Sequence, residues 1–307
     1  MCDTSLELIH RSDVVLDGGD ATSLGRDVRR GMLVRLAAGV FVREATWSGA
    51  CSRHRHMALA RAVVSRLGPS AVLSHGSALA VHGFPVLGDR PSRVHVLAPR
   101  RTTAKVSSLV HQHAAAASPL VVEVVAGLRV VPAARAAVDV ARVGELRAGV
   151  VPLDHGLHVG AFDRAELEAV LAAIPRVPGS RRAAAAVAFA DGRSESPGES
   201  ISRVAVHTAG LAAPVLQQRF PEHGPTIGVV DFWWPEFGVV GEFDGEVKYR
   251  DRDMRGGRSP EQVVVDEKNR EDALRALPEV RTVVRWTWSD ALRAEPLVRA
   301  LVRAGVR

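Results

Sequence analysis

The 307-residue sequence is poor in cysteine: it contains only Cys2 and Cys51, and neither stands in a CxxC or other metal-ligand spacing. A disulfide framework and a structural zinc site are therefore not expected, and a reducing cytoplasm is the expected compartment. The sequence also lacks an apolar run near the roughly 20 residues that a bilayer-spanning helix requires. The N-terminal stretch MCDTSLELIHRSD is acidic and has no apolar core, unlike a secretory signal. We thus expect no membrane partner.

Motifs for nucleotide-dependent and serine-hydrolase chemistry are missing as well. The sequence contains no Walker loop, no dinucleotide-binding glycine pattern and no Gly-x-Ser-x-Gly elbow. We therefore expect no nucleotide cofactor and no serine nucleophile.

The composition is that of a folded protein with a positive excess in its middle third. Apolar residues make up 47% and charged residues 24% of the chain. The length predicts two or three domains. The pattern of expected helices and strands predicts a mixed α/β (α+β) chain of three parts, 1–50, 51–192 and 193–307. Of the net charge of +6, the excess lies in 51–192, with 17 Lys and Arg against 9 Asp and Glu. A nucleic-acid partner and an arginine-rich coding bias both explain this excess.

The first 50 residues have the element order of a winged helix-turn-helix. A helix is expected at 5–11 and a second over about 21–31, with Asp20 as N-cap and Gly31 as the stop. The following LVRLAAGVFV predicts a hairpin. Arginines along the second helix and the wing are candidate DNA contacts, although a structural subdomain with solvated arginines has the same pattern. These arginines are Arg26, Arg29, Arg30, Arg35 and Arg43.

The middle third is expected to mix helices and strands. His75 and His82 are seven residues apart on one helical face, which is compatible with a metal or catalytic role. No matching carboxylate accompanies them, so a structural role is the simpler interpretation.

The last third contains two acids that a hairpin would bring face to face. If Pro235–Gly238 form a four-residue turn, Asp231 lies opposite Glu242, with Cβ atoms about 5 Å apart, and Asp244 lies on the same face. Opposed like charges cost stability unless they are compensated, and a divalent cation such as Mg²⁺ (or Mn²⁺) would compensate them. Lys248 would neutralise charge or orient a water.

The flanking residues carry a family resemblance. VVDFWWPEFGVVGEFDG, with SPGES before it and EKNREDALRAL and VVRWTW after it, resembles domains related to very-short-patch-repair endonucleases of the PD-(D/E)XK superfamily. The resemblance covers about residues 194–290 and implies a restriction-endonuclease-like α-β-β-β-α-β core. GRDVRRGMLVRLAAGVFV, followed by LSHGSALAVHGF, resembles the AbiEi-type antitoxin winged-helix proteins common in actinobacteria.

The resemblance implies roles for particular residues. Asp231 and Glu242 match the metal-binding acids of the nuclease core, while Asp244 stands where the motif has lysine, so Asp244, Lys248 and a metal-bound water all remain candidates for the general base. Glu199 matches an acid that completes the metal site, but it also fits a capping box with Ser196. Phosphate contacts are expected from Arg270 and Arg285.

Two functions follow as expectations. The first is a metal-dependent endonuclease that hydrolyses phosphodiester bonds in DNA. The second is an antitoxin-type transcriptional regulator whose nuclease-like domain is inactive, with a cognate toxin or self-association as further partners.

Overall fold

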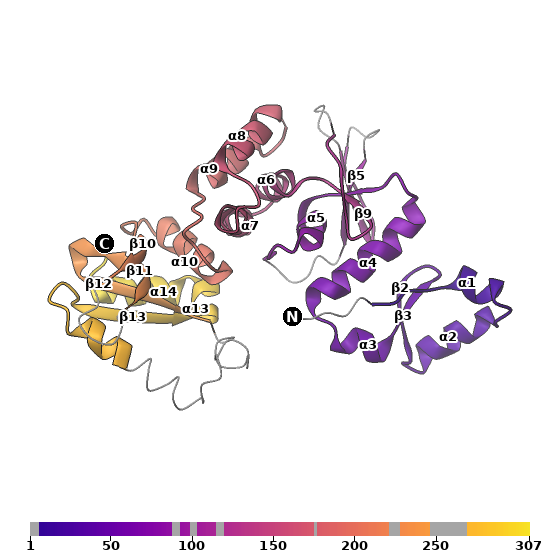
Figure 1. Ribbon diagram of the computed structural model, residues 1–307, viewed down its shortest axis with the longest axis horizontal. Helices are drawn as coiled ribbons and strands as arrows, with labels where there is room; N and C mark the ends of the chain where they lie inside the picture. The colour runs from indigo at the N-terminus through magenta and orange to yellow at the C-terminus, as the bar shows by residue number, and fades with distance from the viewer. Residues whose placement is uncertain are drawn as a thin grey trace. The chain divides into compact units, whose positions relative to one another are not determined.

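The computed structural model describes residues 6–87, 93–98, 103–114, 120–174, 177–220, 228–245 and 269–307. The chain is a mixed α/β protein, and the strands of its described part form three sheets. It divides into two compact units, and Figure 1 shows their elements. Unit 1 consists of Met1–Gly156 and Gly160–Phe189, and unit 2 of Leu157–Val159 and Ala190–Arg307.

Unit 1 joins the segments 1–50 and 51–189 through a shared apolar core. Leu6, Leu36 and Val42 pack in one buried cluster with Ala58 and Ala62 of the long helix α4 (Ser52–Leu67). Because neither segment buries these side chains alone, the expected boundary at residue 50 does not separate compact units. The end of unit 1 at Phe189 lies close to the expected boundary at 192.

The N-terminal part of unit 1 is a three-stranded sheet of order β1-β3-β2 with helices around it. The predicted hairpin and second helix are confirmed: Asp20 caps α2 by accepting the Thr22 amide, and Gly39, with φ 77°, lies in the turn. The helix expected at 5–11 is wrong, because Ile9 and His10 pair with β3 and the helix begins only at Arg11. The elements are β1 (Ile9–His10), α1 (Arg11–Leu16), α2 (Ala21–Arg29), β2 (Leu33–Ala37), β3 (Val40–Arg43), α3 (Glu44–Gly49) and α4 (Ser52–Leu67).

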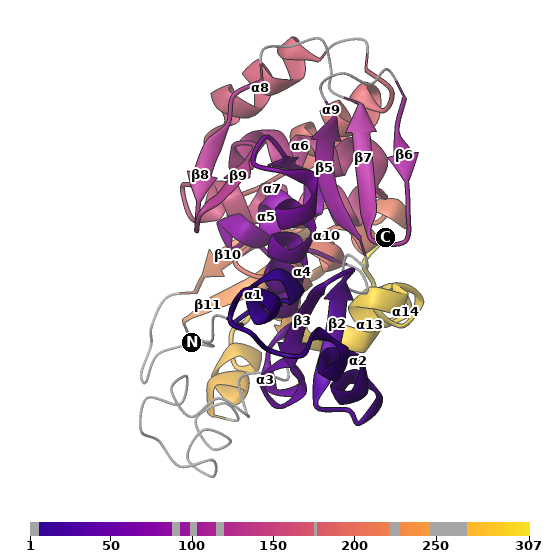
Figure 2. The ribbon, with the colours of Figure 1, turned by 90° about the vertical axis from the view of Figure 1, so that its right-hand side faces the viewer.

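The rest of unit 1 is a six-stranded sheet of order β6-β7-β5-β4-β9-β8 followed by helices (Figure 2). Its strands are β4 (Val72–Leu73), β5 (Val94–Ala98), β6 (Lys105–Val106), β7 (Val110–Ala114), β8 (Glu123–Val125) and β9 (Leu128–Val130). Its helices are α5 (His75–His82), α6 (Ala133–Val143), α7 (Leu146–His158), α8 (Arg164–Ala173) and α9 (Ser180–Phe189). Helix α5 packs against both β5 and α6, so its first residue lies beside the sheet.

Unit 2 is built on a four-stranded mixed sheet of order β10-β11-β12-β13. The first three strands are antiparallel and β13 runs parallel to β12. Its elements are α10 (Pro197–Thr208), β10 (Val215–Arg219), β11 (Val229–Trp234), β12 (Val239–Asp244), a helical segment at 269–275, β13 (Thr282–Thr287), α13 (Trp288–Arg293) and α14 (Glu295–Ala304). From α10 to β13 this is the order α-β-β-β-α-β.

Aromatic side chains form the core of unit 2. The Trp234 indole donates to the Ala212 carbonyl at 2.7 Å, and the Trp286 indole donates to Ser202 Oγ at 2.8 Å. A Cβ at Gly241 would lie 2.6 Å from Trp286, so the two rings close over the bare backbone of β12. These tryptophans therefore stabilise the sheet instead of presenting rings to a ligand.

No helix among the described residues is long and apolar enough to cross a membrane.

Gly198 allows α10 to approach β12, because a Cβ at this position would lie 2.0 Å from the Phe243 ring. Gly198→Ala should lower the free energy of unfolding by about 1–3 kcal/mol through overpacking. Gly245→Ala is the matched control, since its Cβ would meet Phe243 at 3.5 Å, an ordinary contact. Thermal and urea unfolding of both variants measures the difference, and equal stability would contradict the close packing of α10.

Candidate functional site

The predicted register of the acidic hairpin is confirmed. Phe232 pairs with Gly241 and Trp234 with Val239, so the same register places Asp231 opposite Glu242. The turn is a 3₁₀ segment, Pro235–Phe237, closed by Gly238 in the left-handed region with φ 60°. Proline fixes the start of this turn and glycine tolerates its end, so the turn sets which residues face each other.

The sheet opens at the two acids. Within the described segment 228–245, the β11–β12 pairing ends at Phe232 and Gly241, although both strands continue. Beyond that pair, the Phe243 amide donates to Asp231 Oδ2 at 2.8 Å. We call this opening the acid fork: it lies between Val229–Asp231 of β11 and Glu242–Asp244 of β12.

A row of four polar residues crosses the sheet at the acid fork. Glu242 pairs with Arg285 across the parallel strands β12 and β13. Gln217 of β10 lies opposite Asp231, because its neighbours pair as Leu216 with Phe232 and Gln218 with Val230. Gln217 has a positive φ of 52°, a strained conformation for a non-glycine residue that is enriched at functional sites.

Arg270, from the helical segment 269–275, bridges the acid fork. Its two terminal nitrogens donate to the two oxygens of Glu242 at 3.0 Å each, and Nη2 also donates to the Val229 carbonyl on the other strand. Arg270 thus compensates the carboxylate for which the sequence predicts a divalent cation. We expected this arginine to contact phosphate, and here its guanidinium is held by Glu242.

Burial and the facing Asp231 carboxyl raise the pKa of Glu242, and burial is the larger cause. Arg270 and Arg285 oppose the shift without cancelling it. The ionised form of Glu242 is therefore costly to bury, and further positive charge at the acid fork would stabilise it.

Glu199 is 7% exposed and lies beside the row. Its Oε1 accepts from the Ser196 hydroxyl at 2.6 Å, while its Oε2 accepts from Gln217 Nε2 at 3.0 Å. Burial is the main cause that raises its pKa. Ser196 caps α10 by accepting the Glu199 amide at 3.2 Å, which agrees with the capping alternative. Gln217, the residue opposite Asp231, links Glu199 to the row of polar residues.

The other candidate site residues lie at the edges of the acid fork or beyond the described chain. Arg285 Nη2 lies 3.4 Å from Glu271 Oε2. Asp244 ends β12, opposite Thr287. Lys248 lies outside the described residues. In the described part of unit 2, the acids do not bring three ligand atoms within 4.8 Å of one another.

The arginines of the N-terminal segment are exposed on α2 and the hairpin. Arg26 pairs with Asp20 at 2.9 Å, and Arg43 pairs with Glu7 at 3.1 Å. Arg35 Nε donates to the Ala37 carbonyl at 3.4 Å. Among the described residues, neither Arg29 nor Arg30 forms an ion pair. These two arginines are therefore the best placed to contact a phosphate.

The two histidines that the sequence places on one helical face do not form a joint site. His82 Nε2 bonds the Val131 carbonyl at 2.9 Å, which is a structural contact. His75 instead meets His95 and His113 from strands β5 and β7. His95 and His113 were not among the predicted site residues. The alternation His111-x-His113, which puts both histidines on one face of a strand, was the available signal.

The chain resembles proteins of Mycobacterium tuberculosis. It is 32% identical over 179 residues to two proteins, one from strain CDC 1551 / Oshkosh and one from strain H37Rv, both named only "uncharacterized protein". Each match covers 58% of this chain and 64% of the relative, so the chain spans slightly less than two thirds of the relatives' length. No protein-family model matches the chain.

Arg270→Met removes the partner of the Glu242 carboxylate. We expect it to lower the free energy of unfolding by about 1–3 kcal/mol at neutral pH. The loss should shrink as the pH falls below the raised pKa of Glu242 towards its ordinary 4.5, because a protonated Glu242 needs no cation. Urea unfolding at pH 7 and pH 4 measures both values.

Arg275→Met is the matched control on the same helical segment. Arg275 pairs with Glu271 at 2.6 Å, but its side chain is 55% exposed, so its loss should cost less than about 1 kcal/mol. Equal effects of the two substitutions, or no pH dependence for Arg270→Met, would contradict the account of the acid fork.

Proposed function

We propose that the protein is a cytoplasmic, metal-dependent endonuclease that hydrolyses phosphodiester bonds in DNA, with the acid fork as its active site. The observation that carries the proposal is that the register of β11 and β12 places Asp231 opposite Glu242, just beyond the last paired residues, Phe232 and Gly241. The order α-β-β-β-α-β around a mixed sheet agrees with the core that the nuclease resemblance implies.

Asp231 and Glu242 would hold Mg²⁺ or Mn²⁺. The donor set fits hard oxygen-binding cations, which take one or two carboxylates and complete their shell with water and phosphate oxygens. Such an ion would polarise a phosphoryl oxygen and lower the pKa of a water. Glu199 would act on this site indirectly, because Gln217, which lies opposite Asp231, donates to its carboxylate at 3.0 Å.

Arg270 sets a condition on this proposal. Both oxygens of Glu242 accept from Arg270, so a cation must share these oxygens or displace the guanidinium. A displaced Arg270 would remain beside the acid fork, where it and Arg285 could contact the phosphate of a bound DNA strand. The general base remains open among Asp244, Lys248 and a water.

Loss of either facing acid should abolish cleavage. We expect wild-type protein to cut plasmid or single-stranded DNA with Mg²⁺ or Mn²⁺, and Asp231→Asn and Glu242→Gln each to reduce the rate by about 100-fold or more. Glu236→Gln, an exposed acid in the turn of the same hairpin, is the matched control and should cut like the wild type. The readout is the nicking rate at equal protein concentration.

Cleavage that persists in a chelator, or that Asp231→Asn leaves unchanged, would contradict the endonuclease proposal.

The ion pair of Arg270 favours a second candidate: an antitoxin-type transcriptional regulator with an inactive nuclease-like domain. An arginine that permanently occupies the acid fork supplies the compensating charge without a metal. The DNA contacts would then come from α2, whose arginines are exposed on one side of the helix. A cognate toxin or a second copy of the chain as partner stays a prediction.

Removal of two exposed arginines at the C-terminal end of α2, its last residue Arg29 and its C-cap Arg30, tests DNA contact by this segment. Arg29→Ala combined with Arg30→Ala should weaken binding to duplex DNA and reduce the slope of log K against log salt by about 2. Arg181→Ala combined with Arg182→Ala, an exposed pair on α9 of the same unit, should leave the slope unchanged. Fluorescence anisotropy over a salt series measures both, and equal slopes for the two double variants would contradict DNA contact by α2.

A further inference from the structure

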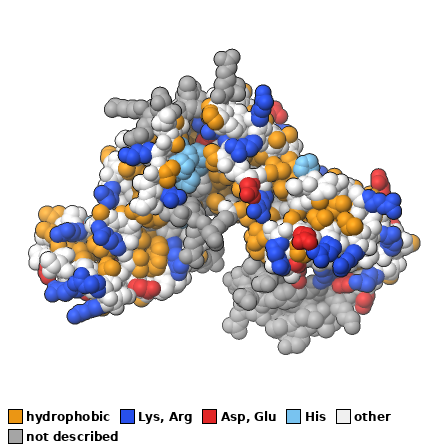
Figure 3. All heavy atoms as spheres, turned by 180° about the vertical axis from the view of Figure 1, so that it is seen from behind, with side chains coloured by type: hydrophobic (Ala, Val, Ile, Leu, Met, Phe, Trp, Pro, Cys, Tyr) orange, Lys and Arg blue, Asp and Glu red, His pale blue; other side chains and the backbone are white. Residues whose placement is uncertain are grey.

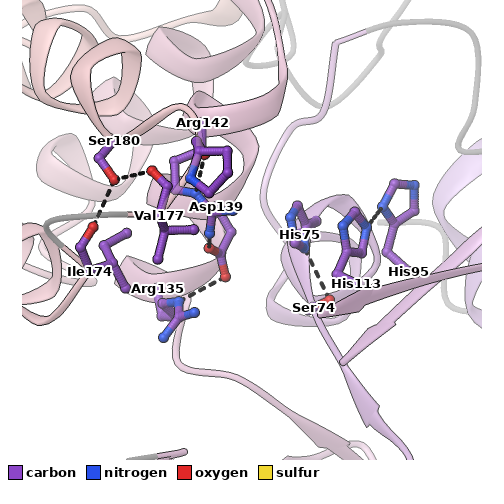
Figure 4. Close-up of polar contacts among 11 residues, drawn as sticks. Ser74, His75, His95, His113, Arg135, Asp139, Arg142, Ile174, Val177 and Ser180 are labelled. Atoms are coloured by element: carbon purple, nitrogen blue, oxygen red, sulfur yellow. Dashed lines mark hydrogen bonds and ion pairs between the residues drawn. The ribbon is translucent and has the colours of Figure 1, made fainter. Parts of the chain in front are cut away.

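Three histidines converge in unit 1, whereas the acid fork belongs to unit 2. His75 begins α5, His95 lies on β5 and His113 on β7, and a ligand atom from each lies within 4.8 Å of the other two. Figure 4 shows the three rings side by side, with His113 between the other two. In Figure 3, a group of histidine side chains is visible at the surface, apart from a second, smaller histidine patch. We call this group the histidine cluster.

The sheet register explains why the strand histidines meet. Strands β5 and β7 are parallel neighbours in which His95 pairs with His111. His113 lies two residues beyond His111 and therefore projects from the same face. The ring of His111 stacks on His113 with centroids 3.9 Å apart. The alternation in VHQHA thus places imidazoles on the face that α5 covers.

His75 is held in a strained and unsatisfied state. Its φ is 49°, a left-handed conformation that costs energy for a residue with a Cβ. His75 is 2% exposed, Nδ1 bonds Ser74 Oγ at 3.0 Å, and the buried Nε2 has no hydrogen-bond partner among the described residues. When Nδ1–H donates to Ser74, Nε2 presents a lone pair, which is the usual way that a hydroxyl or carbonyl orients a metal-binding histidine.

Burial disfavours the protonated form of all three rings. Burial lowers the pKa of His95 to about 4 and that of His113 to about 3. Burial also lowers the pKa of His75 far below its ordinary value. Neutral imidazole is the form that ligates metals, so no protons need to be removed from these residues on binding.

We propose that His75, His95 and His113 bind one divalent transition-metal ion of the zinc type. Imidazole nitrogens suit Zn²⁺, and three histidines leave a fourth position for a water or a ligand. The carboxylates of the acid fork, by contrast, suit Mg²⁺. The histidine cluster is thus a second metal site with different chemistry.

The geometry requires small adjustments. His95 Nδ1 and His113 Nε2 lie 2.8 Å apart in a hydrogen bond between the two rings. Two nitrogens bound tetrahedrally at zinc distances are about 3.3 Å apart, so these rings would separate slightly while His75 moves closer. The proton shared between the rings would shift to the other nitrogen of its ring, because both facing nitrogens must offer lone pairs.

The nearby positive charges are partly balanced. Arg142 of α6 lowers the pKa of His75 and His113, so its positive charge acts on the histidine cluster. Arg142 Nη1 donates to Asp139 Oδ1 at 2.6 Å, and Asp139 also accepts from Arg135 at 2.8 Å (Figure 4). The N-terminus of α5 adds a partial positive charge. Both effects weaken cation binding but are small beside the affinity of three imidazoles for zinc.

Zinc titration of the full-length chain, prepared without a histidine tag and stripped by a chelator, tests the proposal. Calorimetry should show one equivalent of Zn²⁺ bound with a Kd in the micromolar range or tighter, and Co²⁺ should give the visible absorption bands of a tetrahedral site. His95→Gln and His113→Gln should each weaken binding by about 100-fold or more, since a ligand substitution exceeds the effect of losing an outer partner.

Two control variants identify the site. His82→Gln changes the other end of α5, where the ring bonds Val131, and should bind zinc like the wild type. Cys51→Ala removes an exposed thiol whose Sγ lies 3.0 Å from His54 Nδ1, a second place where zinc could bind, and should leave the stoichiometry at one. Zinc should raise the melting temperature of these controls but not that of His95→Gln.

Ser74→Ala tests the zinc site independently if a histidine variant fails to fold. Ser74 makes no side-chain cap to α5, so its hydroxyl serves His75 and not the start of the helix. Its loss should weaken zinc binding by about 10–100-fold while the circular dichroism spectrum is unchanged. No saturable zinc binding by the wild type, or equal affinity in the wild type, His95→Gln and Ser74→Ala, would overturn the proposal.

Discussion

The structure of unit 2 depends on the close opposition of two carboxylates, Asp231 and Glu242, in neighbouring strands. A strand pair does not tolerate this opposition without compensation. In the structure three features accommodate it: the strands part beyond Phe232 and Gly241, Asp231 accepts the Phe243 amide, and Arg270 binds Glu242. The opening, the hydrogen bond and the ion pair are consequences of placing the two acids face to face.

The compensation by Arg270 links the two proposed functions. A guanidinium and a divalent cation are alternative partners for the same carboxylates, and burial raises the pKa of Glu242 even with the guanidinium in place. If a divalent cation replaces Arg270 at Glu242, and Arg270 moves to a DNA phosphate, the protein would be an active nuclease. If the ion pair between Arg270 and Glu242 persists, the protein would have a nuclease-like fold that binds DNA without cleaving it.

Local chemistry made part of this site predictable. Pro235 and Gly238 define a turn, and the turn defines which residues of two strands face each other, so Asp231 opposite Glu242 follows from a short stretch of sequence. The N-cap role of Asp20 and the hairpin turn at Gly39 are also predictable, because both depend on residues close together in the sequence. Ile9 and His10 were misjudged because their strand forms only against β3, which is about 30 residues away along the chain.

Contacts over long sequence distances were not predictable. Arg270 is 28 residues from Glu242, and no periodicity relates an arginine on one helix to an acid on a strand. His75 meets His95 and His113 only because α5 covers the strand face from which both project, whereas helical spacing pointed to His82. In both cases the residue type indicated what the side chain could bind. Which side chains it meets in the folded protein depends on tertiary packing.

The most direct measurement is a crystal structure of the protein soaked with Mn²⁺ and analysed by anomalous scattering. The account predicts an anomalous peak between the carboxylates of Asp231 and Glu242, with Arg270 moved away from at least one Glu242 oxygen. A structure without a peak at the acid fork, in which Arg270 still holds both Glu242 oxygens at saturating Mn²⁺, would contradict the claim that the acid fork is a metal site.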